Sequence, residues 1–232
     1  MKLDSHSKPL NMYGEGDLEL KLNNGGILKA PFAAFDGIGK VSTWFGTDLF
    51  KVQYADEKKG IELNCGRLEL ELLGEAPWTG RITALESPEI RTVQGDRVRA
   101  DEAVLGGMDA KGTFTAVLLR GGCVLTRPSG DQIASREVAI DLNHRKATLS
   151  GESTLKIAGD EPRKITSHGT VALTKETIIM ESPLFEGKVR EADQIHLEDE
   201  RGDLFADRAE LDYEEKKGKW IPKKLLFFGN VR

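Results

Sequence analysis

The sequence contains an internal repeat: Ala-Asp, an alternating segment, a charged turn, an apolar segment and then Gly-x-Val. The clearer copy occupies residues 204–231, and a second occupies residues 98–124. Both copies share Ala-Asp-x-Ala and place an aromatic residue, Phe114 or Trp220, two residues after a glycine in the turn. Repeated units of this size bury their apolar faces by stacking on one another. The repeat therefore restricts the chain to folds built from stacked strand pairs.

Alternating apolar and polar residues predict strands along most of the remaining chain. Residues 18–22, 67–73 and 138–142 alternate in this way, and each segment ends at a turn that contains Gly or Asn. The best helix candidate, residues 31–35, is about one turn long. Short alternating strands separated by frequent turns are typical of antiparallel sandwiches, barrels and jelly rolls. We therefore predict an all-β fold.

Length and composition define the expected organisation. A chain of 232 residues forms one large domain or two small ones. No change in composition marks a linker, so we expect a single domain over residues 1–232. Residues 1–80 have a less regular pattern and are expected to form an end or cap of the same sheet, because the terminal units of repeat folds are often atypical.

Charge and hydrophobicity exclude some classes of function. The formal net charge is -5 and no block of Lys or Arg occurs, so no nucleic-acid partner is expected. No apolar run is long enough to span a bilayer. The first residues lack the apolar region of a secretory signal, which fits either a cytosolic protein or a trimmed mature chain.

Candidate catalytic residues are few. The four histidines have no zinc-type spacing, so no metal site is predicted. His196 shares one strand face with Glu198 and Glu200, but charged residues are common at hairpin ends. Asp101 and Asp207 hold the same repeat position, where an aspartate accepts backbone N–H groups at a bend. We favour that structural role over acid/base chemistry, and expect no catalytic residue and no cofactor.

The two cysteines give two alternatives. Cys65 and Cys123 are the only cysteines in the chain. They can form one disulfide, or they can be two separate buried thiols on strands, which is at least as compatible with the pattern.

The C-terminal copy of the repeat resembles the OstA-like repeat of the lipopolysaccharide transport (Lpt) proteins. Ala206-Asp207 through Tyr213 and Gly229-Asn230-Val231 match its Ala-Asp…Tyr and Gly-Asn-Val elements. Residues 98–125 match less closely. The resemblance implies an antiparallel β-jelly roll, a slightly open and twisted V of stacked strands. It also implies a periplasmic location, as the soluble bridge or the periplasmic part of the inner-membrane component.

The same resemblance implies a ligand and partners. The interior of the V would take the acyl chains of lipopolysaccharide or a related glycolipid, and like-folded Lpt proteins would join edge to edge, with head-to-tail self-association. Alternation predicts the residues that line this groove. They are Ala100, Ala103, Leu105, Ala139, Ile195, Leu197, Leu204, Ala206, Ala209, Leu211, Leu225 and Phe227.

Two alternatives remain open at this point. One is a structural or adhesive β-repeat protein whose interior is a dry, fully packed core. The other, which we favour less, is a β-sandwich hydrolase that acts on carbohydrate through a pair of carboxylates such as Asp101 and Asp207.

Overall fold

The structure, a computed structural model, describes residues 2–3, 9–21, 25–37, 40–57, 60–72, 79–108, 114–144, 146–159, 162–174, 176–216 and 219–232. Within these residues strands dominate, and the one helical segment is a short 3-10 helix, η1 (Glu191–Asp193). Strands pair in antiparallel fashion in both units, as β2 (Pro9–Lys21) does with β3 (Ile27–Asp36) and β22 (Arg208–Lys216) with β23 (Lys219–Phe228). The predicted all-β, antiparallel fold is confirmed.

The chain forms two compact units, which are described separately. The first comprises Met1–Val93 and Arg99–Val117, and the second comprises Gln94–Val98 and Leu118–Arg232. The single domain predicted from composition stays a prediction. The described residues before position 80 form strands like those of the rest of the chain, so their less regular pattern does not mark another class of structure.

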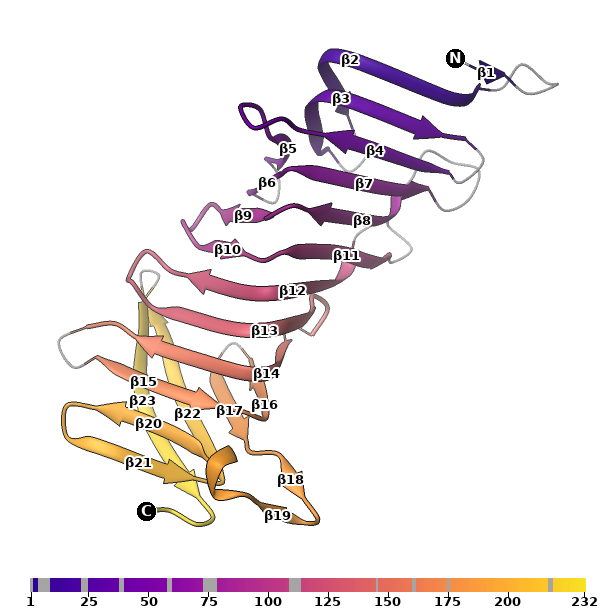
Figure 1. Cartoon of the computed structure of the whole chain (residues 1–232). Coiled ribbons are helices and arrows are strands. Elements are labelled where there is room, and N and C mark those ends of the chain that lie inside the picture. The colour runs from indigo at the N-terminus through magenta and orange to yellow at the C-terminus, as the bar shows by residue number, and fades with distance from the viewer. Residues whose placement is uncertain are drawn as a thin grey trace. The chain divides into compact units, whose positions relative to one another are not determined.

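The strands are labelled in Figure 1. Those before the second unit's long hairpin are β1 (Lys2–Leu3), β2 (Pro9–Lys21), β3 (Ile27–Asp36), β4 (Val41–Phe45), β5 (Val52–Asp56), β6 (Ile61–Cys65), β7 (Arg67–Leu72), β8 (Thr79–Leu85), β9 (Glu89–Thr92), β10 (Arg97–Arg99), β11 (Glu102–Met108) and β12 (Phe114–Thr126). The remaining strands are β13 (Gln132–Asp141), β14 (Lys146–Ile157), β15 (Arg163–Ser167), β16 (Thr170–Leu173), β17 (Thr177–Glu181), β18 (Leu184–Phe185), β19 (Lys188–Val189), β20 (Ile195–Asp199), β21 (Gly202–Ala206), β22 (Arg208–Lys216) and β23 (Lys219–Phe228).

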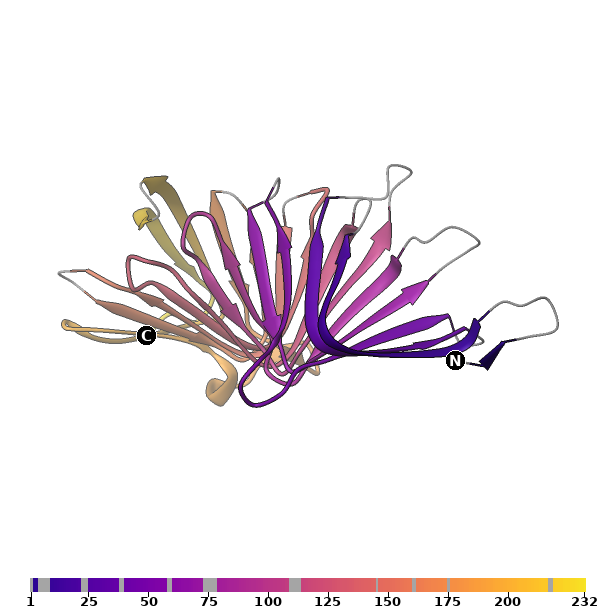
Figure 2. The same ribbon diagram turned by 90° about the horizontal axis from the view of Figure 1, so that it is seen from above.

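The first unit branches from the long hairpin of β2 and β3. The first half of β3 pairs with β5, and its second half pairs with β4. One branch continues through β7, β8 and β11, and the other through β6 and β9. A register shift between Glu15 and Leu18 interrupts the hairpin, and β2 and β3 bend sharply (Figure 2). A bulge of this kind bends a strand, which lets one hairpin serve two diverging branches.

The helix candidate at residues 31–35 is not a helix, because these residues belong to β3. Pro31 lies where β3 changes its partner from β5 to β4, opposite the register shift in β2. Proline lacks a backbone N–H and is tolerated in a sheet at bulges, where no ladder hydrogen bond is lost. The local pattern therefore resembled a helical turn although the tertiary pairing makes it a strand.

The second unit repeats this branching around β13 and β14. Residues 147–149 of β14 pair with β16, whereas residues 153–157 pair with β15. One branch continues through β17, β22 and β23, and the other through β20 and β21. In Figure 1 β22 and β23 run at a steep angle to β15 and β20. We call the line along which the two branches diverge the vertex; there β15 is followed by β16, and β21 by β22. The opposite margin, which contains the β12–β13 and β22–β23 turns, is called the rim.

Apolar side chains fill the space between the two branches of the second unit. Ile165, Ile195 and Leu197 come from the branch that contains β15 and β20. Ile178 and Leu211 come from the branch that contains β17 and β22, and all five belong to one buried cluster. Each fully buried side chain of this size stabilises the folded unit by about 1.5–3 kcal/mol relative to exposure. The second unit is therefore a two-layered structure held by its inner faces.

Both cysteines are free and buried. Burial raises the pKa of the Cys65 thiol to about 12, so it stays protonated at physiological pH. The interpretation of the cysteines as two separate buried thiols is confirmed.

Candidate functional site

The second unit contains most of the residues predicted to line a groove. Ile195, Leu197, Ala209 and Leu211 belong to its buried cluster. The side chains packed against this cluster include Leu204, Leu225 and Phe227, and Ala206 is also fully buried. These eight residues come from strands of both branches, so the structure brings them together between the inner faces.

The other predicted residues do not join this cluster. Ala100, Ala103 and Leu105 belong to the first unit. Ala100 and Ala103 are buried there, and Leu105 is partly buried.

Ala139 does not face the interior, and the prediction for this residue is wrong. Its side chain is exposed, whereas the neighbouring Val138 packs against the buried cluster. The pairing of β13 with β14 shifts between Ser135 and Glu137, where one residue of β13 lies opposite two residues of β14. Such a bulge interrupts the alternation of side chains between the two faces of a strand, so the inward positions of β13 change from Ile133 and Ser135 to Val138.

The interior of the second unit is closely packed. A cavity in its interior, lined by residues of β13, β14, β16 and β17 such as Leu149, Val171 and Met180, has a volume of about 10 Å³. A cavity needs roughly 10–15 Å³ to hold one water molecule. An acyl chain therefore enters this space only if the two branches move apart.

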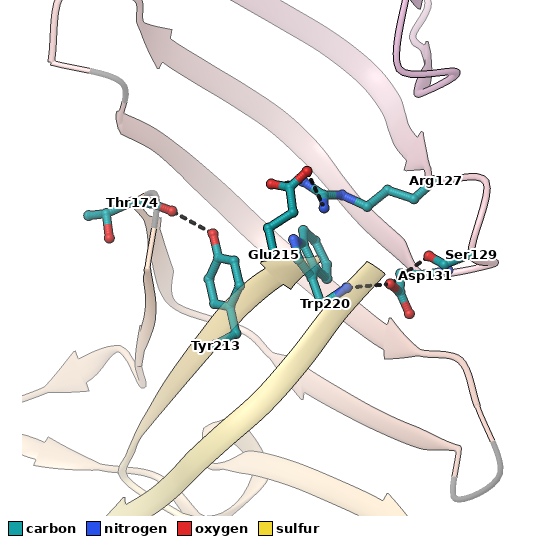
Figure 3. Close-up of polar contacts among 7 residues, drawn as sticks. All are labelled: Arg127, Ser129, Asp131, Thr174, Tyr213, Glu215 and Trp220. Carbon is teal, nitrogen blue, oxygen red and sulfur yellow. Dashed lines mark hydrogen bonds and ion pairs between the residues drawn. The ribbon is translucent and has the colours of Figure 1, made fainter. Parts of the chain in front are cut away.

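The two branches are joined at the rim by a group of polar and aromatic residues. We call Arg127, Asp131, Tyr213, Glu215 and Trp220 the rim cluster (Figure 3). Its first two members lie at the start of the β12–β13 turn and at its end, and the others lie beside the β22–β23 turn. The β22–β23 turn thus reaches from one branch to the margin of the other.

Asp131 connects three segments at this rim. Its carboxylate accepts the backbone N–H of Ala158 at 2.8 Å and that of Trp220 at 3.2 Å. The hydroxyl of Ser129 donates to the same carboxylate at 2.6 Å. Asp131 is only 2% exposed, and hydrogen bonds to a charged acceptor are among the stronger ones in proteins. Asp131 therefore fixes the β22–β23 turn against the opposite branch.

Arg127 provides a second connection. The guanidinium Cζ lies 4.3 Å from the centre of the Trp220 ring, within the range of a cation–π interaction. Its Nη1 and Nη2 lie 3.4 and 3.5 Å from the two carboxylate oxygens of Glu215. The Arg127 side chain is 12% exposed and that of Glu215 is 46% exposed. The cation is therefore enclosed, whereas its partner carboxylate lies largely in solvent.

Tyr213, a further member of the rim cluster, is held in its protonated form. Burial raises the pKa of its phenol, and the hydroxyl donates to the carbonyl oxygen of Thr174 at 2.6 Å. Burial also raises the pKa of the nearby Asp96, and the positive charge of Arg127 opposes this shift. Arg127 thus acts electrostatically on more than one carboxylate.

The repeat motif itself forms a structural clasp at the vertex. The Asp207 carboxylate accepts the backbone N–H of Asn230 at 3.0 Å and its side-chain N–H at 2.9 Å. Gln194 donates to the other carboxylate oxygen at 2.9 Å. The predicted structural role of the aspartate at this position is confirmed for Asp207. Asp101 is exposed, and no corresponding clasp is seen around it in the described part of the chain.

Gly229→Ala is expected to destabilise the second unit by about 1–3 kcal/mol. Gly229 has φ of +85°, and a Cβ there would overlap the Asp207 carboxylate. Thermal unfolding followed by circular dichroism measures the effect. The matched control is Gly187→Ala, because Gly187 has φ of +78° but nothing within 4 Å of an added Cβ. Equal losses in both variants would contradict the importance of the clasp.

His196 has only local partners in the described structure. Its Nε2 lies 2.7 Å from a carboxylate oxygen of Asp203, and its ring stacks on Phe205 at 4.5 Å. Within the described ranges, no three His, Cys, Asp or Glu side chains are grouped so that they could hold a metal ion. His196 therefore has an arrangement typical of a strand face near a hairpin end.

Alternation alone did not find the rim cluster. Arg127 and Asp131 lie in and beside a turn, where the period of two ends, and their partners lie almost ninety residues later. The available signal was the aromatic residue shared by both repeat copies, since Phe114 and Trp220 are both 6% exposed. That signal identifies Trp220 but not its contacts.

Comparisons with protein families and with curated proteins found no match. Among the residues that the structure describes, no helix has the length and apolarity required to cross a membrane. The functional inference therefore depends on the residues of the chain and on the resemblance of its C-terminal repeat.

Proposed function

We propose that this protein is a periplasmic module that binds and carries lipopolysaccharide or a related glycolipid, with acyl chains held between the branches of the second unit. The observation that supports this most is the apolar lining shared by both branches. Ile165 and Ile195 on one branch face a lining that includes Ile178 and Leu211 on the other. An apolar surface between two separable layers suits an alkyl chain, which has no polar groups to satisfy.

Binding requires the branches to separate, because the interior is filled in this structure. Among the described residues the contacts across the rim are a hydrogen bond from Trp220 to Asp131, the ion pair of Arg127 with Glu215 and the cation–π contact of Arg127 with Trp220. An acyl chain gains about 0.8 kcal/mol per buried methylene, so roughly ten methylenes gain about 8 kcal/mol before ordering costs. This gain is larger than the few kcal/mol that such rim contacts contribute. The gain from the lipid therefore offsets the loss of these rim contacts.

The edge of β23 is the proposed contact with like-folded partners. β23 pairs with β22 on one side, and no pairing on its other side is seen among the described residues. Pro222, Lys223 and Lys224 lie on this strand, and proline and lysine disfavour indiscriminate pairing of strand edges. We propose that Lpt-like proteins or a second copy of this chain add to this edge, because strand addition needs an unpaired row of backbone groups.

Native mass spectrometry of the full chain, purified without detergent from a Gram-negative host, tests the proposal. The expected result is a population of protein carrying a bound glycolipid, which is lost after organic extraction and restored by adding lipopolysaccharide. Lipid-free protein before and after that addition would contradict the proposal. Bound phospholipid without glycolipid would contradict the proposed ligand class.

The specific observation that favours a second function is the small interior cavity. A volume of about 10 Å³ is what a structural or adhesive β-repeat protein with a dry core would have. The same experiment separates the two functions, because a permanently closed core takes up no lipid.

A further inference from the structure

We propose that Arg127 and the indole N–H of Trp220 bind the anionic headgroup, a phosphate or carboxylate, of the amphiphile whose chain lies between the branches. In this proposal Glu215 occupies the position of that headgroup when no ligand is bound. The inference deepens the proposed function and depends on it.

Unsatisfied donors are concentrated at this place. Nε and Nη1 of Arg127 and Nε1 of Trp220 are buried and make no hydrogen bond, although Nη1 lies 3.4 Å from a carboxylate oxygen of Glu215 in their ion pair. They are three of seven such side-chain atoms among the described residues. A buried donor without an acceptor costs about 1–3 kcal/mol, and such groups in a native structure call for an explanation. All three are N–H donors, so the missing partner is an acceptor.

The chemistry of these donors favours an anionic oxygen. A guanidinium presents its N–H groups in a planar fork that matches the oxygens of carboxylate and phosphate. The Trp220 ring lies against this guanidinium, so the indole N–H is a neighbouring donor. An anionic group at this point would meet donors from the β12–β13 turn and from β23.

The position of the cluster suits an amphiphile and not only a free anion. Trp220 and Tyr213 belong both to the rim cluster and to the buried apolar cluster, and their rings lie 5.6 Å apart. A ligand with its alkyl chain in the apolar cluster therefore has its headgroup at Arg127. The apolar chain and the charged group of one molecule would thus contact adjoining parts of the same unit.

Glu215 is suited to give way to such a headgroup. It reaches Arg127 at 3.4 and 3.5 Å, which is long for a charge-assisted contact. Its side chain is 46% exposed, so the carboxylate is readily rehydrated when it leaves Arg127, and the arriving anion takes its place beside the enclosed guanidinium. The carboxylate of Glu215 is the chemical equivalent of the ligand's own anion.

Titration calorimetry with three probes tests the inference: dodecyl phosphate, dodecyl glucoside and inorganic phosphate. We expect the full chain to bind dodecyl phosphate at least about tenfold more tightly than dodecyl glucoside, the difference that one charge-assisted interaction supplies. R127Q is expected to remove this preference. E215Q is expected to increase the affinity for dodecyl phosphate several-fold and to leave dodecyl glucoside unchanged.

The matched controls are R120Q and E137Q. Arg120 and Glu137 form an exposed ion pair in the same unit, with Nε and Oε2 3.2 Å apart, so each control repeats a charge change away from the rim. Both controls should keep the preference of the unmodified chain. If R127Q fails to fold, E215Q still decides, because an unchanged affinity for dodecyl phosphate in that variant overturns the inference.

The outcomes separate this inference from the proposed function. Equal binding of both detergents, unaffected by R127Q, overturns the headgroup site and leaves lipid binding intact. No binding of either detergent overturns lipid binding itself. Inorganic phosphate binding as tightly as dodecyl phosphate overturns the amphiphile site and identifies a site for a free anion.

Discussion

Asp131→Ala is expected to destabilise the second unit by about 3–5 kcal/mol. The backbone N–H groups of Ala158 and Trp220 lose the carboxylate that accepts them, and each loses a hydrogen bond to a charged group in a buried position. The rim would then open more readily. Urea unfolding followed by circular dichroism measures the loss, with the two units analysed as separate transitions where the curve requires it.

Two further substitutions make this result specific. Asp131→Asn retains one carbonyl oxygen for Ala158 and should lose less than half as much stability as the alanine variant. Asp141→Ala removes an exposed aspartate that also accepts two backbone N–H groups, those of Asn143 and His144, and should have a much smaller effect. A loss at Asp131 no larger than that at Asp141 would contradict the role of Asp131 as the connection across the rim.

Gly169→Ala is expected to have an effect of similar size, at least about 3 kcal/mol. Gly169 lies in the short connection from β15 to β16, where the chain passes from one branch to the other. A Cβ at this position would overlap the carbonyl oxygen of Glu181, and it would also lie 3.0 Å from the backbone nitrogen of Pro183. Backbone atoms cannot rotate away as a flexible side chain does. The backbone must therefore move, either at the β15–β16 connection or at Glu181 and Pro183.

Gly106→Ala is the matched control for this substitution. An added Cβ at Gly106 meets nothing within 4 Å, and its φ lies outside the left-handed region. We expect a change within about 0.5 kcal/mol. Thermal unfolding of the two variants compares them directly. If Gly169→Ala were as stable as Gly106→Ala, the tight packing of the vertex would be contradicted.

The fold class was predictable because alternation is a local signal. In β22 the period of two correctly places Ala209, Leu211 and Tyr213 on the buried face. The same rule fails for Ala139, because the bulge after Ser135 reverses the pattern and leaves no mark in the composition of β13. Pro31 shows the same limit, since only its tertiary pairing makes residues 31–35 a strand.

The branching and the rim were not predictable from local patterns. Each long hairpin supplies two branches because one strand changes partners along its length, as β14 does between β16 and β15. The sequence of β14 does not indicate which strands will pair with it. The contacts of Arg127 and Asp131 with Trp220 likewise depend on how separate turns meet. The clasp at Asp207 was foreseen because the repeat placed the aspartate at a strand boundary.

In-cell photo-crosslinking on β22 tests the central claim, that acyl chains lie between the branches, most directly. A photoreactive residue at Leu211 would sit on the inner face, where Leu211 is 2% exposed, and one at Asp212 would sit on the outer face of the same strand. Expression in a Gram-negative host followed by irradiation should give a lipopolysaccharide adduct at position 211 and none at position 212. Adducts at neither position, or equal adducts at both, would contradict the claim.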